Sequence, residues 1–309
     1  MSPTTKAVVQ VALVKGENRY NNVIASLGLI KKDVFNKVKN KRKVLIKPNM
    51  VSTQVQLAAT HVDAIRATLD FLSELGVKKF LVGEGPAYAP AEEGFKNFGY
   101  LTLKNEYDIE FMDLNEDDYV EVNVFDRNLE PLTLKISKTA VMSDFRVSLT
   151  PPKTHDTVIA TLSLKNIVMG CLIDHDKSRM HQGYQAINLS LFKLAKLVPP
   201  HLSVIDGFFG MEGNGPVDGE PVILGVAISS TDFLAADTIA AEVMGLKVSQ
   251  IGYLNYCNQA KVGIGNISDI HVVGDSIERC KKKFKPHFTF EQQLMWKIYK
   301  NTTTLKSFP

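Results

Sequence analysis

The stretch that decides the fold begins with VLIKPN (44–49) and ends with KKFLVGEG (78–85). Each contains a short apolar run that is typical of a buried strand. Between them, Thr60 is expected to cap a helix over 61–75, whose apolar residues recur on one face. The order strand, helix, strand, with nearly continuous apolar strands, indicates a parallel sheet covered on both faces.

The same alternation continues on both sides of this stretch. Short runs rich in Val, Ile and Leu predict further strands, and apolar residues at helical spacing predict further helices. We therefore expect an α/β protein with a mainly parallel, Rossmann-like sheet and helices on both faces. The additional strands are expected within 7–14, 145–153, 201–216, 222–230 and 267–275, and the additional helices within 21–39 and 232–244.

Residues 118–140 differ from the rest of the chain, because they alternate with period two around a polar turn at 126–128. This pattern predicts an antiparallel hairpin. No linker or repeat marks a domain boundary. We expect an α/β core over 1–275, with room for two subdomains whose boundary cannot be read, and a basic tail over 276–309 with a helix around 292–299.

The composition is that of an ordinary soluble globular protein. The 309 residues are 45% apolar and 22% charged, with 36 Lys and Arg against 33 Asp and Glu, a formal charge of +3. These values exclude a disordered chain, a collagen-like repeat and a coiled-coil rod. The small charge and the scattered basic residues argue against nucleic acid as a partner.

Three cysteines, Cys171, Cys257 and Cys280, lie far apart and form no CxxC motif. We expect free thiols in a reducing cytosol, and no iron–sulfur cluster. No stretch reaches the roughly 18 apolar residues that cross a bilayer, and the apolar N-terminal run is expected to be a strand rather than a signal peptide. The expected location is therefore cytoplasmic, without a membrane partner.

Unusual polar groups follow one expected strand after another. Because ligands of parallel α/β sheets bind at the carboxyl ends of the strands, these groups are expected to converge on one crevice. This inference assumes that the strands are parallel and adjacent. The groups are Lys47 and Asn49 after the first strand of the deciding stretch, Glu84 after the second, Lys153 and His155 after 145–150, and Asp206 after 202–205.

Three lysines, Lys47, Lys153 and Lys165, would give this crevice ammonium groups that suit a phosphate or carboxylate ligand. For Lys47 and Lys153 the alternative is a solvated side chain at a strand end. Lys165 lies in the apolar segment TLSLKN, where an unpaired charge is costly, so a partner or a function is expected for it.

The sequence GMEGNGP (210–216) forms a glycine-rich loop after a strand. Glycines permit positive φ, so successive N–H groups could form an anion-binding nest; a plain turn is the alternative. Pro216 rules out the usual nucleotide-binding fingerprints, because no helix opens there. The substrate-binding residues expected in this loop are Glu212, Gly213, Asn214 and Gly215.

Three histidines, His155, His175 and His181, fall within 27 residues and lie beside Asp156, Asp174 and Asp176 in the sequence. Such residues move protons or bind a divalent metal. The spacing matches no standard zinc motif, so metal binding stays open. His155 and His181 are favoured because their neighbours are loop-like. The predicted catalytic residues are His155, His181, Lys165 and Glu84.

Taken together, a series of short motifs resembles the domain-of-unknown-function family number three-hundred-and-sixty-two, over roughly residues 7–275. The resemblance implies an α/β fold without a settled activity. Many members carry an added ferredoxin-like cysteine motif, which is absent from this sequence. The motifs are KPN (47–49), GEG (83–85), KTH (153–155), LKN (164–166), DG (206–207) and EGNGP (212–216), followed by STD (230–232), AAD (235–237) and MG (244–245).

A more distant likeness is to nickel-pincer lactate racemase, in which a lysine anchors the cofactor and histidines bind metal and move protons. By this analogy Lys165, with His155 and His181, would take such parts.

Our first hypothesis is a small-molecule enzyme that binds a carboxylate or phosphate at the strand ends and uses acid–base or metal-assisted chemistry. The alternative is a non-catalytic binding or maturation partner of a metalloenzyme, docking through KKKFK (281–285) and the tail with Trp296; the run is otherwise a solvated basic face. The sequence leaves the cofactor unknown and allows a homo-oligomer.

Overall fold

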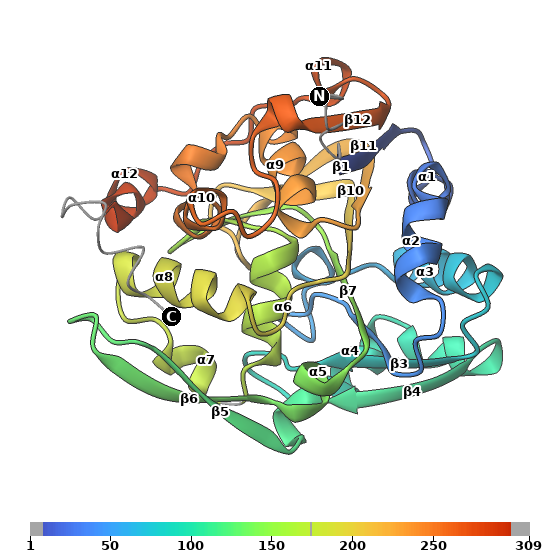
Figure 1. The fold of residues 1–309 in the computed structure, drawn as a ribbon, viewed down its shortest axis with the longest axis horizontal. Helices are drawn as coiled ribbons and strands as arrows, with labels where there is room; N and C mark the ends of the chain where they lie inside the picture. Colours follow the sequence, from blue (N-terminus) through green and yellow to red (C-terminus); the bar gives the residue numbers. More distant parts are fainter. Residues whose placement is uncertain (1–8, 174, 298–309) are drawn as a thin grey trace, which may run out of the picture.

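The computed structural model describes residues 9–173 and 175–297. Its main sheet has ten strands in the order β12-β1-β11-β10-β7-β2-β3-β4, with β8 and β9 attached beside β10 (Figure 1). The strands are β1 (Val9–Lys15), β2 (Val44–Lys47), β3 (Lys79–Glu84), β4 (Asp108–Asp113), β5 (Tyr119–Phe125), β6 (Pro131–Ser137), β7 (Phe145–Thr150), β8 (Lys153–His155), β9 (Ile159–Thr161), β10 (Leu202–Glu212), β11 (Glu220–Ser230) and β12 (Ile270–Gly274).

The strands of this path run parallel to one another except β11, which is antiparallel to both of its neighbours. The mainly parallel α/β sheet expected from the sequence is therefore confirmed. The helices are α1 (Arg19–Leu29), α2 (Lys31–Val38), α3 (Val62–Glu74), α4 (Ala91–Asn97), α5 (Lys138–Met142), α6 (Ser163–Cys171), α7 (Asp176–Arg179), α8 (Tyr184–Ala195), α9 (Phe233–Val243), α10 (Gly252–Gln259), α11 (Ile277–Cys280) and α12 (Phe290–Gln293).

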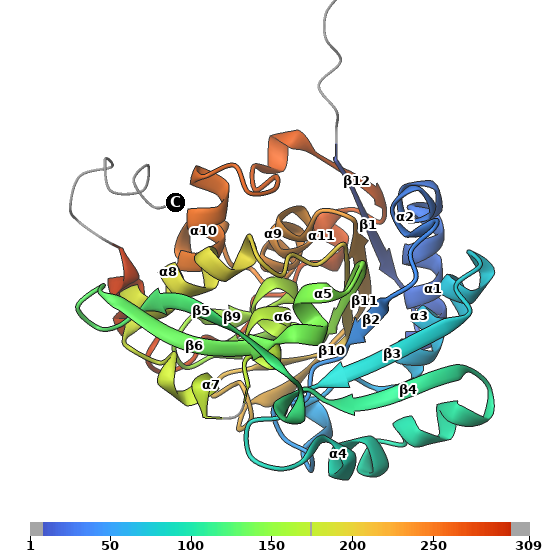
Figure 2. The same ribbon diagram turned by 60° about the horizontal axis from the view of Figure 1, so that its bottom comes forward.

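Helices cover both faces of the sheet, and alternate strand residues enter two different cores. In β1, Val11 and Leu13 belong to the core that includes residues of α6, α8, α9 and α10, whereas Ala12 belongs to the core that includes residues of α1 to α4. Figure 2 shows the two groups of helices on opposite sides of the sheet. Because both faces are buried, the strands read as continuous apolar runs, which is why the sequence indicated them clearly.

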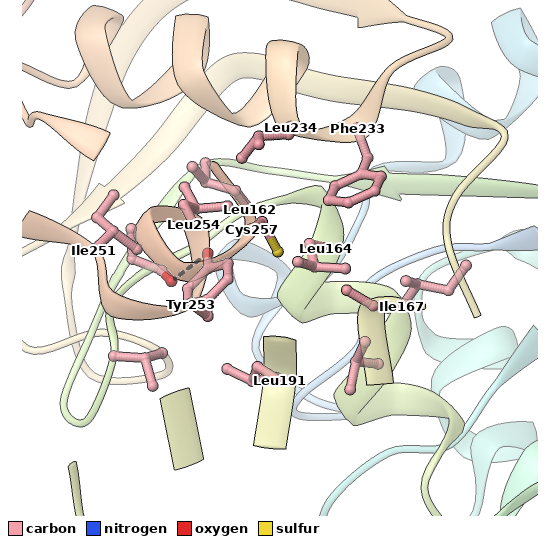
Figure 3. Close-up of a cluster of buried hydrophobic side chains, with 14 of the residues drawn as sticks. Leu162, Leu164, Ile167, Leu191, Phe233, Leu234, Ile251, Tyr253, Leu254 and Cys257 are labelled. Carbon is pink, nitrogen blue, oxygen red and sulfur yellow. Dashed lines mark hydrogen bonds between the residues drawn. The ribbon is translucent and has the colours of Figure 1, made fainter. Parts of the chain in front are cut away.

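Helix α6 lies at the centre of one core. Figure 3 shows its residues Leu164 and Ile167 among side chains of α8, α9 and α10, including Phe233 and Tyr253. The Tyr253 hydroxyl donates a hydrogen bond of 3.1 Å to the Ala160 carbonyl, just before the helix. This packing fixes the helix that carries Lys165 into the site described below.

The expected hairpin is confirmed as the two-stranded sheet of β5 and β6 (Figure 2). Its turn is held by Asp126, whose carboxylate accepts hydrogen bonds from the amides of Asn128 and Glu130. The segment expected as one helical region over 21–39 is two helices, because the chain turns at Ile30, which lies between α1 and α2.

The chain after β12 packs on the core as far as it is described. In the basic run, Phe284 is buried and its amide donates to the Met244 carbonyl. The helix expected around 292–299 is shorter: α12 is followed by a 3-10 turn at Leu294–Trp296, and residues after 297 lie outside the described part. The Trp296 indole is buried and donates to the Gln250 carbonyl.

Candidate active site at the strand ends

A cavity of about 150 Å³ lies where the carboxyl ends of β2, β3 and β8 meet α6. Its walls combine lysines, histidines and two carboxylates with a few apolar side chains. The lining residues are Lys47, Asn49, Met50, Val51, Glu84, Gly85, Ala87, Tyr88, His155, Asp156, Thr161, Lys165, Asn166, Met169, Gly170, Lys177, Ser178, His181 and Pro216.

Lys47, the last residue of β2, has hydrogen-bond partners within the protein. Its ammonium lies 2.7 Å from Glu84 Oε2 and also donates to the Pro48 carbonyl and to Asn166 Oδ1. Lys47 and Glu84 are 1% and 2% exposed. Burial raises the pKa of Glu84, and the adjacent Lys47 ammonium opposes that rise. A buried pair with this many hydrogen bonds forms a rigid floor for the cavity.

A glycine allows α6 to cross this floor. A Cβ atom on Gly170 would lie 2.0 Å from Lys47 Cε and 2.8 Å from Glu84 Oε1, distances that real Cβ atoms do not show. Any larger residue would displace the ion pair. The helix thus fits against the ends of β2 and β3 in two ways. Asn166 of the LKN segment accepts a hydrogen bond from Lys47, and Gly170 leaves room for the Lys47–Glu84 pair.

Lys153 is also committed to partners and does not line the cavity. Its ammonium donates to Asn49 Oδ1 at 2.6 Å and to the Ala58 carbonyl at 3.1 Å. Asn49 Nδ2 donates in turn to Asn166 Oδ1, which ties this group to Lys47. Burial, with smaller effects of Lys165 and Lys47, lowers the pKa of Lys153 well below its usual value.

Lys165 is the exception among these buried lysines. It lies in the first turn of α6, is 6% exposed and lines the cavity. Within residues 9–173 and 175–297, no oxygen accepts a hydrogen bond from its Nζ. Burial lowers its pKa to about 8, although Asp156 opposes the change. The amine of Lys165 therefore lies in a polar cavity without a hydrogen-bond acceptor among the described residues.

The helix that presents Lys165 begins on a buried carboxylate. Asp237 of α9 is 0% exposed, and its two oxygens accept the amides of Ser163 at 2.8 Å and Leu164 at 3.0 Å. These are first-turn amides that the helix itself cannot satisfy. Burial raises the pKa of Asp237 to about 7, and the two amides oppose this rise. Asp237 thus fixes the backbone immediately before Lys165.

His155 ends β8 and is 3% exposed. Burial and the positive charge of Lys165 lower its pKa to about 3, so the ring is neutral. Two neighbours compete for Nδ1: the Thr157 amide donates to it at 3.0 Å, and the Asp156 carboxylate lies 2.9 Å away. The amide favours a proton on Nε2, whereas the carboxylate favours one on Nδ1, so both tautomers have support.

His181 follows α7 and lines the cavity near Lys165. Its Nδ1 lies 2.8 Å from the Lys177 carbonyl, which can only accept, so Nδ1 carries the proton and Nε2 has a lone pair. His181 is exposed on its outer side, and the partial desolvation of its ring at the cavity wall, followed by the charge of Lys165, lowers its pKa. A neutral imidazole with an unprotonated Nε2 is suited to act as a general base.

The predicted site residues did not include Thr161, Lys177 and Asn166, whose polar side chains also line the cavity. The Thr161 hydroxyl is buried and lacks a hydrogen-bond partner among the described residues. Lys177 donates to Asn115 and to the Leu172 carbonyl, and burial lowers its pKa to about 8. Asn166 links Lys47 to Asn49. Only Asn166 carried a signal, because it follows Lys165 in LKN. Thr161 begins the apolar segment TLSLKN and Lys177 lies in a polar stretch, and nothing in either pattern pointed to a site.

Asp206 does not line the cavity, and the pleat of the sheet explains why. Lys47 lies two residues after Leu45, on the face of α6, whereas Asp206 lies two residues after Val204, on the face of α1. There it forms an ion pair of 2.9 Å with Arg19. Burial raises the pKa of Asp206, and Arg19 opposes this rise.

The glycine-rich loop is also turned away from the cavity, except for Pro216. Glu212 accepts a hydrogen bond from the Lys285 amide, and the Gly213 amide donates to the Lys285 carbonyl. A Cβ on Gly215 would lie 2.2 Å from the Thr154 carbonyl oxygen, so this glycine packs on β8. Asn214 is exposed, as is His175.

Two further findings concern metals and membranes. Among residues 9–173 and 175–297, no three His, Cys, Asp or Glu side chains are placed to hold a metal ion. Over the same residues, no helix has the length and apolar character needed to cross a membrane. The three cysteines are buried and free.

The fold and the cavity define a mixed α/β protein with a polar site at the carboxyl ends of its parallel strands. A family model described as "Domain of unknown function (DUF362)" matches residues 44–242, and the chain belongs to this family. The resemblance inferred from the sequence motifs is thus confirmed.

The known proteins that are similar to the chain include a cyanobacterial relative and a solved enzyme structure. "Thylakoid-associated protein sll1697" of Synechocystis sp. is 30% identical over 223 residues, which are 70% of this chain and 67% of the relative. The solved lactate racemase apoprotein from Thermoanaerobacterium thermosaccharolyticum has a TM-score of 0.51 at 14% identity, covering 78% of this chain. This chain spans 57% of the racemase, so the likeness is one of fold.

Proposed function

We propose that the protein is an enzyme that binds a small carboxylate or phosphate anion at Lys165 and moves a proton with His181 and His155. The observation that carries this proposal is the Lys165 ammonium, which is buried in a cavity without an acceptor for its hydrogen bonds. An isolated buried charge is costly, so a ligand that neutralises it gains the corresponding interaction energy.

The charges of the cavity support an anionic ligand. The lining side chains include three ammonium groups, Lys47, Lys165 and Lys177, against two carboxylates, Glu84 and Asp156, while both histidines have lowered pKa values. One positive charge is therefore in excess. Because Lys47 and Lys177 already donate to protein oxygens, the anion belongs at Lys165, beside the unpartnered Thr161 hydroxyl.

Proton transfer is the chemistry that these neighbours support. His181 Nε2 is an unprotonated base, and His155 can present either tautomer to a ligand. A correctly placed general acid or base accelerates a reaction by about 10²–10⁴-fold. We propose that the enzyme works in the cytosol on a small molecule, without nucleic acid, which agrees with its free cysteines.

Binding and proton transfer can be tested separately, without knowing the physiological substrate. Small carboxylates and phosphates are screened by thermal shift, and those that bind are incubated in D₂O while NMR follows the exchange of C–H protons. We expect Lys165→Met to lose binding, and His181→Gln to keep binding but lose exchange. The proposal fails if no anion stabilises the wild type more than Lys165→Met.

A second candidate rests on the meeting of Lys165, His155 and His181 in one cavity. These are the residue types that a nickel-pincer racemase uses to anchor its cofactor, bind the metal and move a proton. Elemental analysis and intact mass spectrometry of natively purified protein test it. Nickel together with a mass addition on Lys165 would support this candidate, and an unmodified Lys165 without nickel would reject it.

A further inference from the structure

The four buried lysines at or beside the cavity differ in one property that matters for covalent chemistry. The ammonium groups of Lys47, Lys153 and Lys177 each donate to at least two protein oxygens. Only Lys165 has no acceptor among the described residues, while it lines the cavity. A lysine becomes a nucleophile when its amine is desolvated and carries a lone pair instead of a proton.

The surroundings of Lys165 favour this unprotonated state. Burial lowers the pKa of Lys165 to about 8, so near pH 7.5 it holds on the order of 10² times more neutral amine than an exposed lysine. His181 Nε2, with its lone pair, is available nearby to take the proton that the amine loses. The site thus supplies both a nucleophile and a base.

The size and charge of the cavity limit the electrophile. An engineered cavity of about 150 Å³ holds benzene, which has six non-hydrogen atoms, and the cavity beside Lys165 has about the same volume. A 2-oxo acid of three carbons also has six such atoms. Its carboxylate would offset the positive charge of a protonated imine, and the unpartnered Thr161 hydroxyl could donate to it.

We propose that Lys165 forms a Schiff base with a small 2-oxo acid, which makes this class of compound the substrate of the site. The inference rests on the proposed function, because it uses the same cavity, but it adds a covalent step that anion binding does not require.

The step balances without an oxidant or reductant. The Lys165 Nζ lone pair attacks the ketone carbon, and the C=O π electrons move to oxygen. Nζ then passes one proton to His181 Nε2, which gives it to this oxygen to form a neutral carbinolamine. The hydroxyl takes up one proton from solvent and leaves as water, while the Nζ lone pair forms the C=N bond. An amine, a ketone and one proton thus become a protonated imine and water.

The test is reductive trapping on the full chain. The protein is treated with pyruvate and sodium cyanoborohydride, and the modified lysines are located by peptide mass spectrometry. We expect one reduced pyruvate, attached at Lys165, at a rate on the order of 10²-fold above that of any exposed lysine, as the larger neutral amine fraction predicts. Lys47, Lys153 and Lys177 serve as internal controls and stay unmodified.

Two comparisons make the outcome decisive. Lys165→Met should abolish the rapid label, and the wild-type map itself answers the question should that variant fail to fold. Lactate has the carboxylate but no ketone, so it tests anion binding alone. If lactate and pyruvate stabilise the wild type but label appears only slowly over surface lysines, the Schiff base is refuted and the proposed function stands; if neither binds, both fail.

Discussion

At the scale of single residues, the site is defined by which polar groups have partners. Lys47 and Lys165 line the same cavity and are both nearly inaccessible, yet Lys47 is paired with Glu84 and Lys165 has no acceptor among the described residues. Their chemistry differs for this reason. A paired lysine stabilises the site, whereas an unpaired one is available to a ligand.

This contrast predicts opposite effects of the same substitution. Lys47→Met leaves Glu84 buried without its counter-charge and should lower the free energy of unfolding by about 3–5 kcal/mol. Lys165→Met removes an unpartnered buried charge and should leave stability unchanged or raise it. Urea unfolding of both variants is the measurement. Equal destabilisation would show that Lys165 has a structural partner after all.

A second residue-scale prediction concerns glycine. Gly170→Ala places a methyl group on the Lys47–Glu84 pair and should cost about 1–3 kcal/mol, the typical penalty of overpacking. Gly28→Ala is the matched control, because Gly28 also lies in a helix, α1, but has no heavy atom within 4 Å of its Cβ position. The control should gain about 0.5–1 kcal/mol. If both variants lose stability, the cost of Gly170→Ala does not come from contact with the Lys47–Glu84 pair.

At this scale the sequence predicted in part which side chains meet in the cavity. Lys47, Glu84 and His155 could be grouped because each ends a strand and parallel strands end at one edge. The face of the sheet was the missing information: Asp206 points to α1 because side chains alternate along β10. The hydrogen bond from Lys153 to Asn49 could not be predicted either, because it depends on the position of a loop, which no periodic pattern in the sequence encodes.

At the scale of elements, α6 is the helix that positions Lys165 and Asn166 in the cavity. Asp237 accepts hydrogen bonds from the first two amides of this helix. Lys165 and Asn166 are its third and fourth residues, and Gly170, near its end, packs directly against the Lys47 side chain. The helix is nine residues long and apolar on several sides, so its position depends on packing rather than on propensity.

The buried cap of α6 predicts a pH dependence of stability. The pKa of Asp237 is raised from 3.8 to about 7 by burial, so between these values the folded protein keeps a proton that the unfolded chain has lost. The contribution of Asp237 to the free energy of unfolding is therefore full below about pH 4 and falls as pH rises through 7. Asp237→Asn cannot ionise and lacks this slope.

We thus expect Asp237→Asn to gain stability relative to the wild type as pH increases from 4 to 8, by as much as about 1.4 kcal/mol per pH unit within that interval. Urea titrations at several pH values measure the difference. A difference that stays constant with pH would contradict a buried, proton-binding Asp237.

At the scale of the whole molecule, the patterns that repeat along the chain predict the fold. They do not predict how segments that are distant in sequence pack together. The parallel strands were readable because both faces of the sheet are buried. The β8–β9 hairpin was not, because three-residue strands carry little periodicity. Nor could the sequence show that the segment after β12 returns to the site.

This return is made by Gln293 of α12. Its side-chain amide donates to the His155 carbonyl at 2.8 Å and its oxygen accepts from the Ile159 amide, so one buried glutamine joins both strands of the hairpin that carries His155. The two strands are already paired at these positions. The end of the described chain therefore holds one wall of the cavity in place.

Gln293→Leu keeps the approximate volume but leaves the His155 carbonyl and the Ile159 amide without this partner. We expect a loss of about 1–3 kcal/mol in the free energy of unfolding and weaker anion binding, because His155 would no longer be held. Gln292→Leu is the control, since Gln292 is the exposed neighbour and should change neither quantity. Unfolding and thermal-shift titrations of both variants decide: if Gln293→Leu binds the anion as tightly as Gln292→Leu, the tail stabilises the fold without shaping the site.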